Sequence, residues 1–416
     1  MAQPNADTRE TLYVARQAIL DARWQVFGYE LLYRADGGAA NVSSDLAAAR
    51  VMTDAVLNVG LDTLTGGRPA FLNLTRSLLV SEAWSVLSPD AVVFELHKDI
   101  PVDKEVIAMC EQLHKAGYPL ALCDFTLDSD AEALLRYAKF IKVDMVAPRR
   151  DKPAAIADYL ESSGIRLIAE NVESGAAFEA ACAAGYSLFQ GHFFCQPKTC
   201  SAAPVPASRL AYVQLLSALN RPRLSLSEIE DLIKHDVSLS YRVLRCINSA
   251  AYGLRREIRS IKEALVLLGV EPIRSWASVW CVAGLNSSGT FELATTALVR
   301  ARCCELLGEH FSKAEEGSEM FLIGLCSLLD AMLGRPLHEA IADLPLSAAA
   351  RSAVLGEERN AARCVLDAVI AYENGLWDEA ALASHGAGLT PALLADAYAG
   401  ALRWAREFSR VVAMAA

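Results

Sequence analysis

The sequence predicts an α/β domain followed by an all-α domain. In the first half, short apolar runs alternate with amphipathic helical stretches, whereas the second half shows helical periodicity with few strand patterns. A segment of small residues with two prolines, 198–208, separates the halves and reads as a linker. With 416 residues, 53% apolar, the chain is long enough for two or three domains. We place the domains at 1–200 and 201–416.

Six apolar runs of the first half predict β-strands, because each is seven or eight residues long and rich in β-branched or aromatic side chains. They cover 69–75, 91–97, 119–125, 140–146, 166–172 and 187–194. Amphipathic stretches at 103–117, 131–138, 152–164 and 175–185 lie between them, and several end in glycine, a common helix stop. This alternation predicts a mostly parallel sheet, open or closed.

Isolated polar residues stand near the C-terminal end of each predicted strand. They are Asn73, Glu95, Asp124, Lys142, Glu170 and Gln190. A single polar residue there could simply face solvent, but six in succession indicate that the strand ends converge on one site. That is the arrangement at the C-terminal face of a (β/α)8 barrel of the TIM type. Their oxygen atoms suit a hard divalent cation such as Mg²⁺ or Mn²⁺.

The second half predicts a helical bundle. Its amphipathic segments include 207–220, 226–235, 238–253, 260–270 and 271–285, and further helical patterns continue to the C-terminus. Alanine and leucine dominate these segments, and glycine or proline separates them.

Composition excludes several classes of protein. The net charge of −11 argues against a protein that binds a nucleic-acid polymer without sequence preference. The 11 cysteines form no CxxC pair, so we expect free thiols in a cytoplasmic protein. No secretory signal and no membrane span are predicted, because every long apolar stretch carries a charge.

Seven sequence blocks of the first half resemble the EAL domain, which hydrolyses or binds cyclic di-GMP. In chain order they are GYELLYR, FLNLT, VVFELHK, LCDF, FIKVD, AENVE and QGHFFCQP, spread over about residues 11–200. The resemblance implies a two-metal hydrolysis of one phosphodiester bond. It assigns Glu30, Asn73, Glu95 and Asp124 to metal binding, Lys142 and Glu170 to catalysis, and Arg34, Glu173 and Gln190 to the ligand.

Three departures from the EAL pattern fall in one region. The family's two adjacent aspartates read Cys123-Asp124, and the missing one is the carboxylate that bridges the metals. A thiol is a soft donor that suits Mg²⁺ or Mn²⁺ poorly. The following Gly-Thr-Gly is absent, and the family's Thr-Glu reads His97-Lys98. We therefore expect the metal to be weakly held or absent, and turnover to be slow or absent.

The second half resembles the HDOD domain, a helical relative of HD phosphohydrolases that lacks their metal ligands. The blocks that carry this are SEIEDLIKHDVSLSYRVLRCINSAAYG and SIKEALVLLGV, and the tail resembles EAL–HDOD proteins of the YuxH type. Although His235-Asp236 resembles the HD dipeptide, the other histidines of this half form no obvious set, so a surface or capping role is expected.

The retained site residues admit two interpretations. They could form a polar core in which Lys142 neutralises two carboxylates, or a pocket for a metal, cyclic di-GMP or a similar nucleotide. Three functions follow: a nucleotide-sensing adaptor with a protein partner at the HDOD domain, an active cyclic di-GMP phosphodiesterase, or a scaffold that binds no nucleotide. The resemblance also suggests a homodimer.

Overall fold

The computed structural model describes residues 12–35, 60–127, 130–146, 152–196, 225–234, 260–269, 291–311, 314–342 and 346–415, together with single positions between them. The chain forms two compact units. The first contains Met1–Phe193 and Ala371–Trp377, and the second contains Phe194–Ile370 and Asp378–Ala416. The predicted linker at 198–208, His235-Asp236 and the Asn248–Ala250 block lie outside the described residues.

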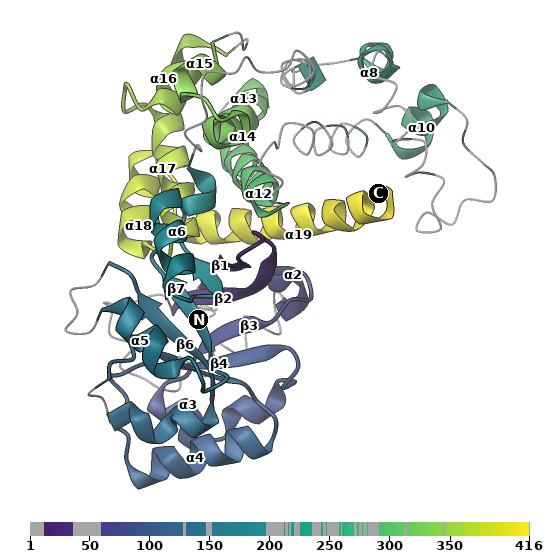
Figure 1. The fold of residues 1–416 in the computed structure, drawn as a ribbon. Coiled ribbons are helices and arrows are strands. Elements are labelled where there is room, and N and C mark those ends of the chain that lie inside the picture. The colour runs from purple at the N-terminus through teal and green to yellow at the C-terminus, as the bar shows by residue number, and fades with distance from the viewer. Residues whose placement is uncertain are drawn as a thin grey trace, which may run out of the picture. The chain divides into compact units, whose positions relative to one another are not determined.

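The first unit is a closed eight-stranded barrel with strands in the order β1 to β8 (Figure 1). The strands are β1 (Leu12–Asp21), β2 (Val26–Ala35), β3 (Ala70–Asn73), β4 (Val92–Leu96), β5 (Leu120–Cys123), β6 (Ala138–Asp144), β7 (Arg166–Glu170) and β8 (Leu188–Gln190). The predicted barrel is confirmed, and all six predicted strands are present.

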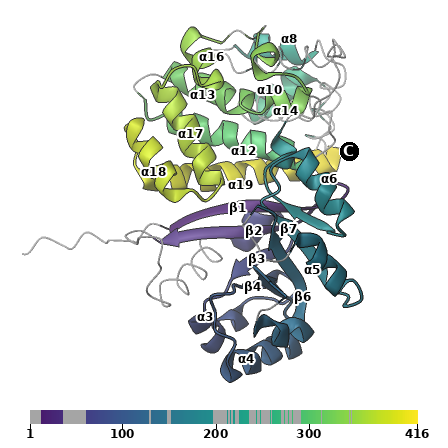
Figure 2. The same ribbon diagram turned by 60° about the vertical axis from the view of Figure 1, so that its left-hand side comes forward.

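One strand departs from a fully parallel barrel. β1 pairs antiparallel with both β2 and β8, whereas the remaining neighbours are parallel. Figure 2 shows β1 and β2 as a long two-stranded ribbon. A short turn joins them, because antiparallel neighbours need no crossover helix. The sequence-based strand prediction did not include either of these two strands.

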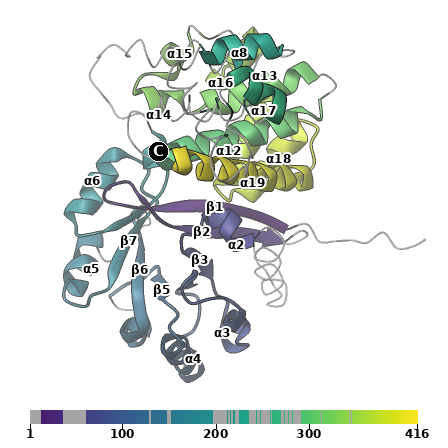
Figure 3. The same cartoon turned by 90° about the vertical axis from the view of Figure 1, so that its right-hand side faces the viewer.

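Helices cover the outside of the barrel (Figure 3). They are α2 (Leu61–Thr65), α3 (Arg76–Val80), η2 (Ala83–Val86), α4 (Lys104–Lys115), η3 (Asp130–Tyr137), α5 (Pro153–Leu160), α6 (Gly175–Ala183) and η4 (Phe193–Cys195). Local chemistry sets their starts: Asp103 accepts a hydrogen bond from the Val106 amide, and Ser174 accepts one from Ala177. The predicted helix at 131–138 is a 3₁₀ helix that ends where β6 begins.

The second unit is helical in its described residues. The helices of this part of the chain, apart from the residues of Ala371–Trp377 that belong to the first unit, are α8 (Leu226–Lys234), α10 (Ile261–Leu268), α12 (Phe291–Gly308), α13 (Ala314–Cys326), α14 (Leu329–Leu333), α15 (Leu337–Ala340), α16 (Ala348–Leu355), α17 (Ala361–Glu373), α18 (Trp377–Gly386) and α19 (Pro391–Ala415). α12 is buried on nearly all sides and packs against α13 and α19. A Cβ atom on Gly324 would lie 2.7 Å from the Ala301 Cα, so glycine permits the close approach of α13 to α12.

No helix in the described part of the chain has both the length and the apolar character needed to cross a bilayer. The cysteines in that part are free thiols, and most of them are buried.

Candidate functional site: a polar layer above the apolar barrel core

The barrel interior contains an apolar layer and a polar layer that follow one another along the strands. The apolar layer is a cluster of buried side chains, Ile19, Phe71, Val93, Ala121, Phe140, Ile168 and Leu188. Two residues further along the parallel strands stand Asn73, Glu95, Cys123, Lys142, Glu170 and Gln190. Because side chains alternate across a strand, residues two apart point to the same side. The strand periodicity therefore carries these residues into the barrel interior.

Lys142 lies at the centre of the polar layer. Its Nζ atom lies 2.8 Å from Glu30 Oε2, 2.8 Å from Glu95 Oε1 and 2.9 Å from Glu170 Oε1. The Lys142 side chain is 1% exposed, and that of Glu95 is 0% exposed. One buried ammonium group thus neutralises carboxylates from three different strands.

Amide side chains complete the surroundings of Glu30. Gln190 donates from Nε2 to Glu30 Oε2 and to Gln17 Oε1, both at 2.6 Å. Asn73 lies 3.4 Å from the other Glu30 oxygen. Because the donors come from β3, β6 and β8, the position of Glu30 on β2 depends on closure of the whole barrel.

Burial and mutual repulsion shift the pKa values of the carboxyl groups. Burial and the nearby charge of Glu30 raise the pKa of Glu95 to about 8. Burial also raises the pKa of Glu170. Glu30 behaves differently: burial acts to raise its pKa, but attraction to Lys142 and hydrogen bonds from Gln190 and Lys142 outweigh burial and lower it.

Lys142 stays charged in this environment. Burial acts to lower its pKa, but the carboxylates of Glu30, Glu95 and Glu170 raise the pKa of Lys142 well above its usual value. The charge of Lys142 is thus maintained by its three partners.

Two oxygens in this layer, Glu95 Oε2 and Gln190 Oε1, lack a hydrogen-bond partner among the described residues. Glu95 Oε2 is buried and has no hydrogen bond, an arrangement that is rare for buried carboxylates. Oxygens of Glu30, Asn73 and Glu95 are donors of the type that a hard divalent ion prefers. The place of the bridging aspartate is taken by the Cys123 thiol, so the donors fit one such ion better than two.

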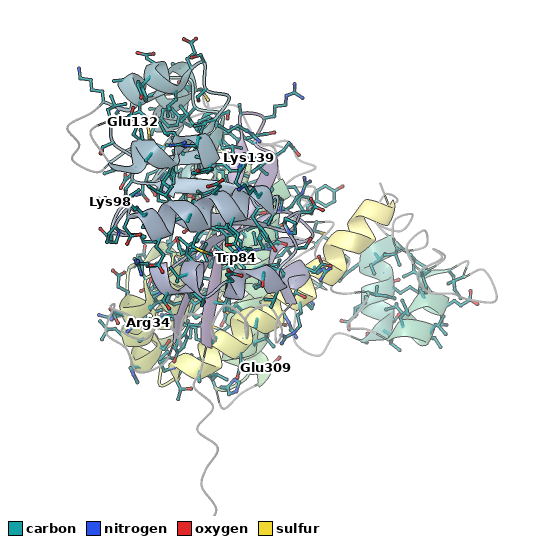
Figure 4. All side chains as sticks on the ribbon, turned by 90° about the horizontal axis from the view of Figure 1, so that it is seen from below. Arg34, Trp84, Lys98, Glu132, Lys139 and Glu309 are labelled. Carbon is teal, nitrogen blue, oxygen red and sulfur yellow. The ribbon has the colours of Figure 1, made fainter. Side chains whose placement is uncertain are left out.

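The residues that depart from the EAL pattern interact at the rim of the polar layer. His97 Nε2 lies 2.6 Å from Asn73 Oδ1, and Lys98 Nζ lies 3.5 Å from Asp124 Oδ2. Cys123, not Asp124, occupies the inward position, since β5 ends at Cys123 and Asp124 follows with a positive φ of 53°. In the view of Figure 4, Lys98 lies at the margin of the barrel.

Two of the predicted ligand-binding residues lie away from Lys142. Arg34 is partly buried on β2, four residues beyond Glu30, which corresponds to about 13 Å along a strand. Glu173 follows β7, and its carboxylate lies 3.9 Å from His192 Nδ1. The third, Gln190, belongs to the polar layer itself.

Sequence reasoning missed three contributors to this site. Gln17 contacts Gln190, the Tyr33 hydroxyl donates to the Asn73 carbonyl at 2.8 Å, and His97 reaches the Asn73 side chain. The apolar run at 12–20, interrupted only by Arg16 and Gln17, could have indicated the strand that carries Gln17. For His97, the sequence showed a departure from the family but no contact.

Comparison with known proteins identifies the family of the chain. The EAL domain profile matches residues 39–197, and the HDOD domain profile matches residues 205–334. The protein YuxH of Bacillus subtilis (strain 168), itself uncharacterized, is 34% identical over 379 residues, which are 88% of this chain and 92% of YuxH. The chain belongs to the EAL–HDOD family.

A second EAL–HDOD relative has an assigned activity. The cyclic di-GMP phosphodiesterase CdgJ of Vibrio cholerae is 28% identical over 417 residues, which are 99% of this chain and 96% of CdgJ. The predicted family, a cyclic di-GMP signalling family, is thereby confirmed. Whether an individual member hydrolyses the nucleotide depends on its site residues.

Two solved structures that match part of the chain contain cyclic di-GMP. Klebsiella pneumoniae BlrP1, in a calcium and cyclic di-GMP complex, is 23% identical with a TM-score of 0.37, covering 46% of this chain and 56% of that chain. Bacillus subtilis YkuI, in complex with cyclic di-GMP and calcium, is 17% identical with a TM-score of 0.38, covering 62% and 72%. Because both TM-scores are low, neither structure carries an argument about the function of this chain.

Proposed function

We propose that the EAL domain of this protein is a cyclic di-GMP receptor with slow or absent hydrolysis. The observation that carries the proposal is the buried Cys123 thiol, 4% exposed, in the polar layer where the resemblance places a metal-bridging carboxylate. A second observation agrees with it. Glu170, the residue assigned to proton transfer, is already paired with Lys142 at 2.9 Å.

The proposed roles divide between binding and chemistry. Arg34 would contact a ligand phosphate through its guanidinium group, with Glu173 and Gln190 as supporting residues. A divalent ion held by Glu30, Asn73 and Glu95 would stabilise negative charge on the phosphate, and Asp124, the fourth predicted ligand, would have to leave Lys98 to join them. Lys142 would position the attacking water, and Glu170 would accept its proton. With one bridging carboxylate missing, binding survives more readily than turnover.

The helical unit is the proposed output domain. In the described residues, His310, His338 and His385 are each exposed on different segments, so they assemble no metal set of the HD type. We therefore propose that this HDOD domain acts by binding a protein partner. We also propose a homodimer and a cytoplasmic location, the latter because free thiols are typical of reducing compartments.

The decisive test measures binding and hydrolysis separately. Purified full-length protein is titrated with cyclic di-GMP in Ca²⁺ by calorimetry, and the linear product is quantified in Mg²⁺ or Mn²⁺. We expect binding by the wild type, and hydrolysis at least about 100-fold slower than in Cys123→Asp, about 2.7 kcal/mol of transition-state stabilisation. Cys123→Ser is the matched control, because it removes the thiol without adding a carboxylate.

The alternative function, an active phosphodiesterase, is favoured by the identity of 28% to CdgJ over nearly the whole chain. Rapid hydrolysis by the wild type, abolished in Glu30→Ala, would establish it and refute the receptor proposal. Absence of both binding and hydrolysis would leave the scaffold interpretation.

A further inference from the structure

Two of the departures from the EAL pattern converge on one point of the polar layer. One ligand atom each from Glu95, His97 and Cys123 lies within 4.8 Å of the other two. Among the described residues, no other group of three histidine, cysteine or acidic side chains meets this condition. His97 and Cys123 are 26 positions apart in sequence, so the barrel, not a local motif, brings them together.

We propose that Glu95, His97 and Cys123 form a binding site for a zinc-type divalent ion. A carboxylate oxygen, an imidazole nitrogen and a thiolate sulfur form a donor set typical of zinc and cobalt, whereas Mg²⁺ and Mn²⁺ prefer oxygen alone. In tetrahedral zinc sites the ligand atoms lie roughly 3.3–3.8 Å apart. Contraction of the cluster by about 1 Å, within the reach of side-chain rotation, would reach this geometry.

The unpaired oxygen of Glu95 agrees with a cation at this site. Glu95 binds Lys142 through Oε1, whereas Oε2 is buried and has no hydrogen-bond partner. A bound cation would satisfy that oxygen while the ion pair with Lys142 remained intact. Because His97 Nε2 lies 2.6 Å from Asn73 Oδ1, the metal would bind His97 through Nδ1, and Asn73 would act as the outer hydrogen-bond partner that metal-binding histidines commonly have.

The charge balance of the polar layer favours a divalent ion. When ionised, Glu30, Glu95 and Glu170 carry three negative charges around the single positive charge of Lys142. The adjacent Lys98 is paired with Asp124, so it does not supply the missing positive charge. With the Cys123 thiolate that would bind the metal, the cluster has a net charge of −3, and a dication would reduce it to −1.

Exposure indicates how the ion would be reached. Glu95 and Cys123 are buried, and His97 is exposed at the rim. Three protein ligands with one open side are typical of zinc sites that keep a position for water or a ligand. The site therefore faces the end of the barrel at which the polar layer lies.

Cobalt spectroscopy tests this proposal without reference to hydrolysis. Metal-free full-length protein, kept reduced, is titrated with Co²⁺ in the absence of nucleotide. We expect one tightly bound ion with a sulfur-to-cobalt charge-transfer absorption that Zn²⁺ displaces. Cys123→Ser should lose this absorption, and His97→Gln should bind Co²⁺ at least about tenfold more weakly. Cys182→Ser, which removes a partly exposed thiol on α6, should leave both unchanged.

A change of metal preference provides the second measurement. Cys123→Asp should weaken Zn²⁺ binding and strengthen Mn²⁺ binding, because an oxygen donor replaces sulfur. Circular dichroism of each metal-free variant checks folding, and the exposed His97 can be replaced even if Cys123 variants fold poorly. A wild type without charge-transfer absorption, or equal Co²⁺ affinity in His97→Gln, would overturn the proposal. Since no nucleotide is present, this failure is distinct from failure of the receptor proposal.

Discussion

The two layers of the barrel interior differ sharply although they are only two residues apart. Phe140 and Lys142 share β6, and both are about 1% exposed. Phe140 packs against Phe27 and Phe71, with ring centroids 5.7 and 5.5 Å away, whereas Lys142 touches three carboxylates. Equal burial therefore affects stability differently in the two layers. Excluding water stabilises the apolar layer, whereas the polar layer is stable only while every charge has a partner.

Removal of the central charge should have the largest effect. Lys142→Met leaves Glu30, Glu95 and Glu170 buried without a cation, and we expect a loss of about 3–5 kcal/mol in the free energy of unfolding at pH 8. The loss should shrink at pH 5, because the carboxyl groups can then be protonated. Urea denaturation at the two pH values measures this difference. An equal loss at both would show that Lys142 acts by packing alone.

A cavity in the apolar layer should lower the free energy of unfolding nearly as much as removal of Lys142 does, but without pH dependence. Phe140→Ala removes a ring that contacts Phe27 and Phe71, and we expect a loss of about 3–4 kcal/mol in the free energy of unfolding. Because no titratable group is involved, the loss should be the same at pH 5 and pH 8. A loss that changes with pH would break the contrast between the layers.

Glu95 should make the stability of the metal-free protein fall as pH rises. Burial raises its pKa to about 8 in the native state, so between pH 5 and 8 the native protein holds a proton that the unfolded chain has released. The free energy of unfolding then decreases with pH, by at most about 1.4 kcal/mol per unit. In the presence of a chelator, the free energy of unfolding of Glu95→Gln should decrease between pH 5 and 8 by about 1–2 kcal/mol less than that of the wild type. The exposed Glu179→Gln is the control and should follow the wild type.

The rim ion pair should matter least for stability. Lys98 is 61% exposed and Asp124 31% exposed in their pair, so water screens the attraction. We expect Lys98→Ala to change the free energy of unfolding by less than about 0.5 kcal/mol. Thermal denaturation at low and high salt checks this. A larger, salt-sensitive loss in the free energy of unfolding would show that the pair of Lys98 and Asp124 is strongly coupled to the polar layer.

Much of the fold could be predicted from the sequence because its signals are local. Apolar runs separated by amphipathic stretches located β3 to β8, and capping residues such as Asp103 and Ser174 set helix starts. Six polar residues at the strand ends were predicted to converge. The structure joins five of them, Asn73, Glu95, Lys142, Glu170 and Gln190, with Glu30 in one connected cluster, whereas Asp124 lies beside Lys98. β1 and β2 were not predicted, although they form a local antiparallel hairpin; only the pairing of β1 with β8 depends on barrel closure.

The sequence by itself determined the order of the two domains, the family and the residue types at the strand ends. Only the tertiary structure decided which of those residues meet. In β5 every residue from Leu120 to Cys123 is buried, so the apolar run LALC does not reveal which residues face the interior. Barrel closure turned Cys123 inward, left Asp124 beside Lys98, and brought His97 near Cys123 and Glu95. Contacts between strands depend on register and closure, which no local pattern encodes.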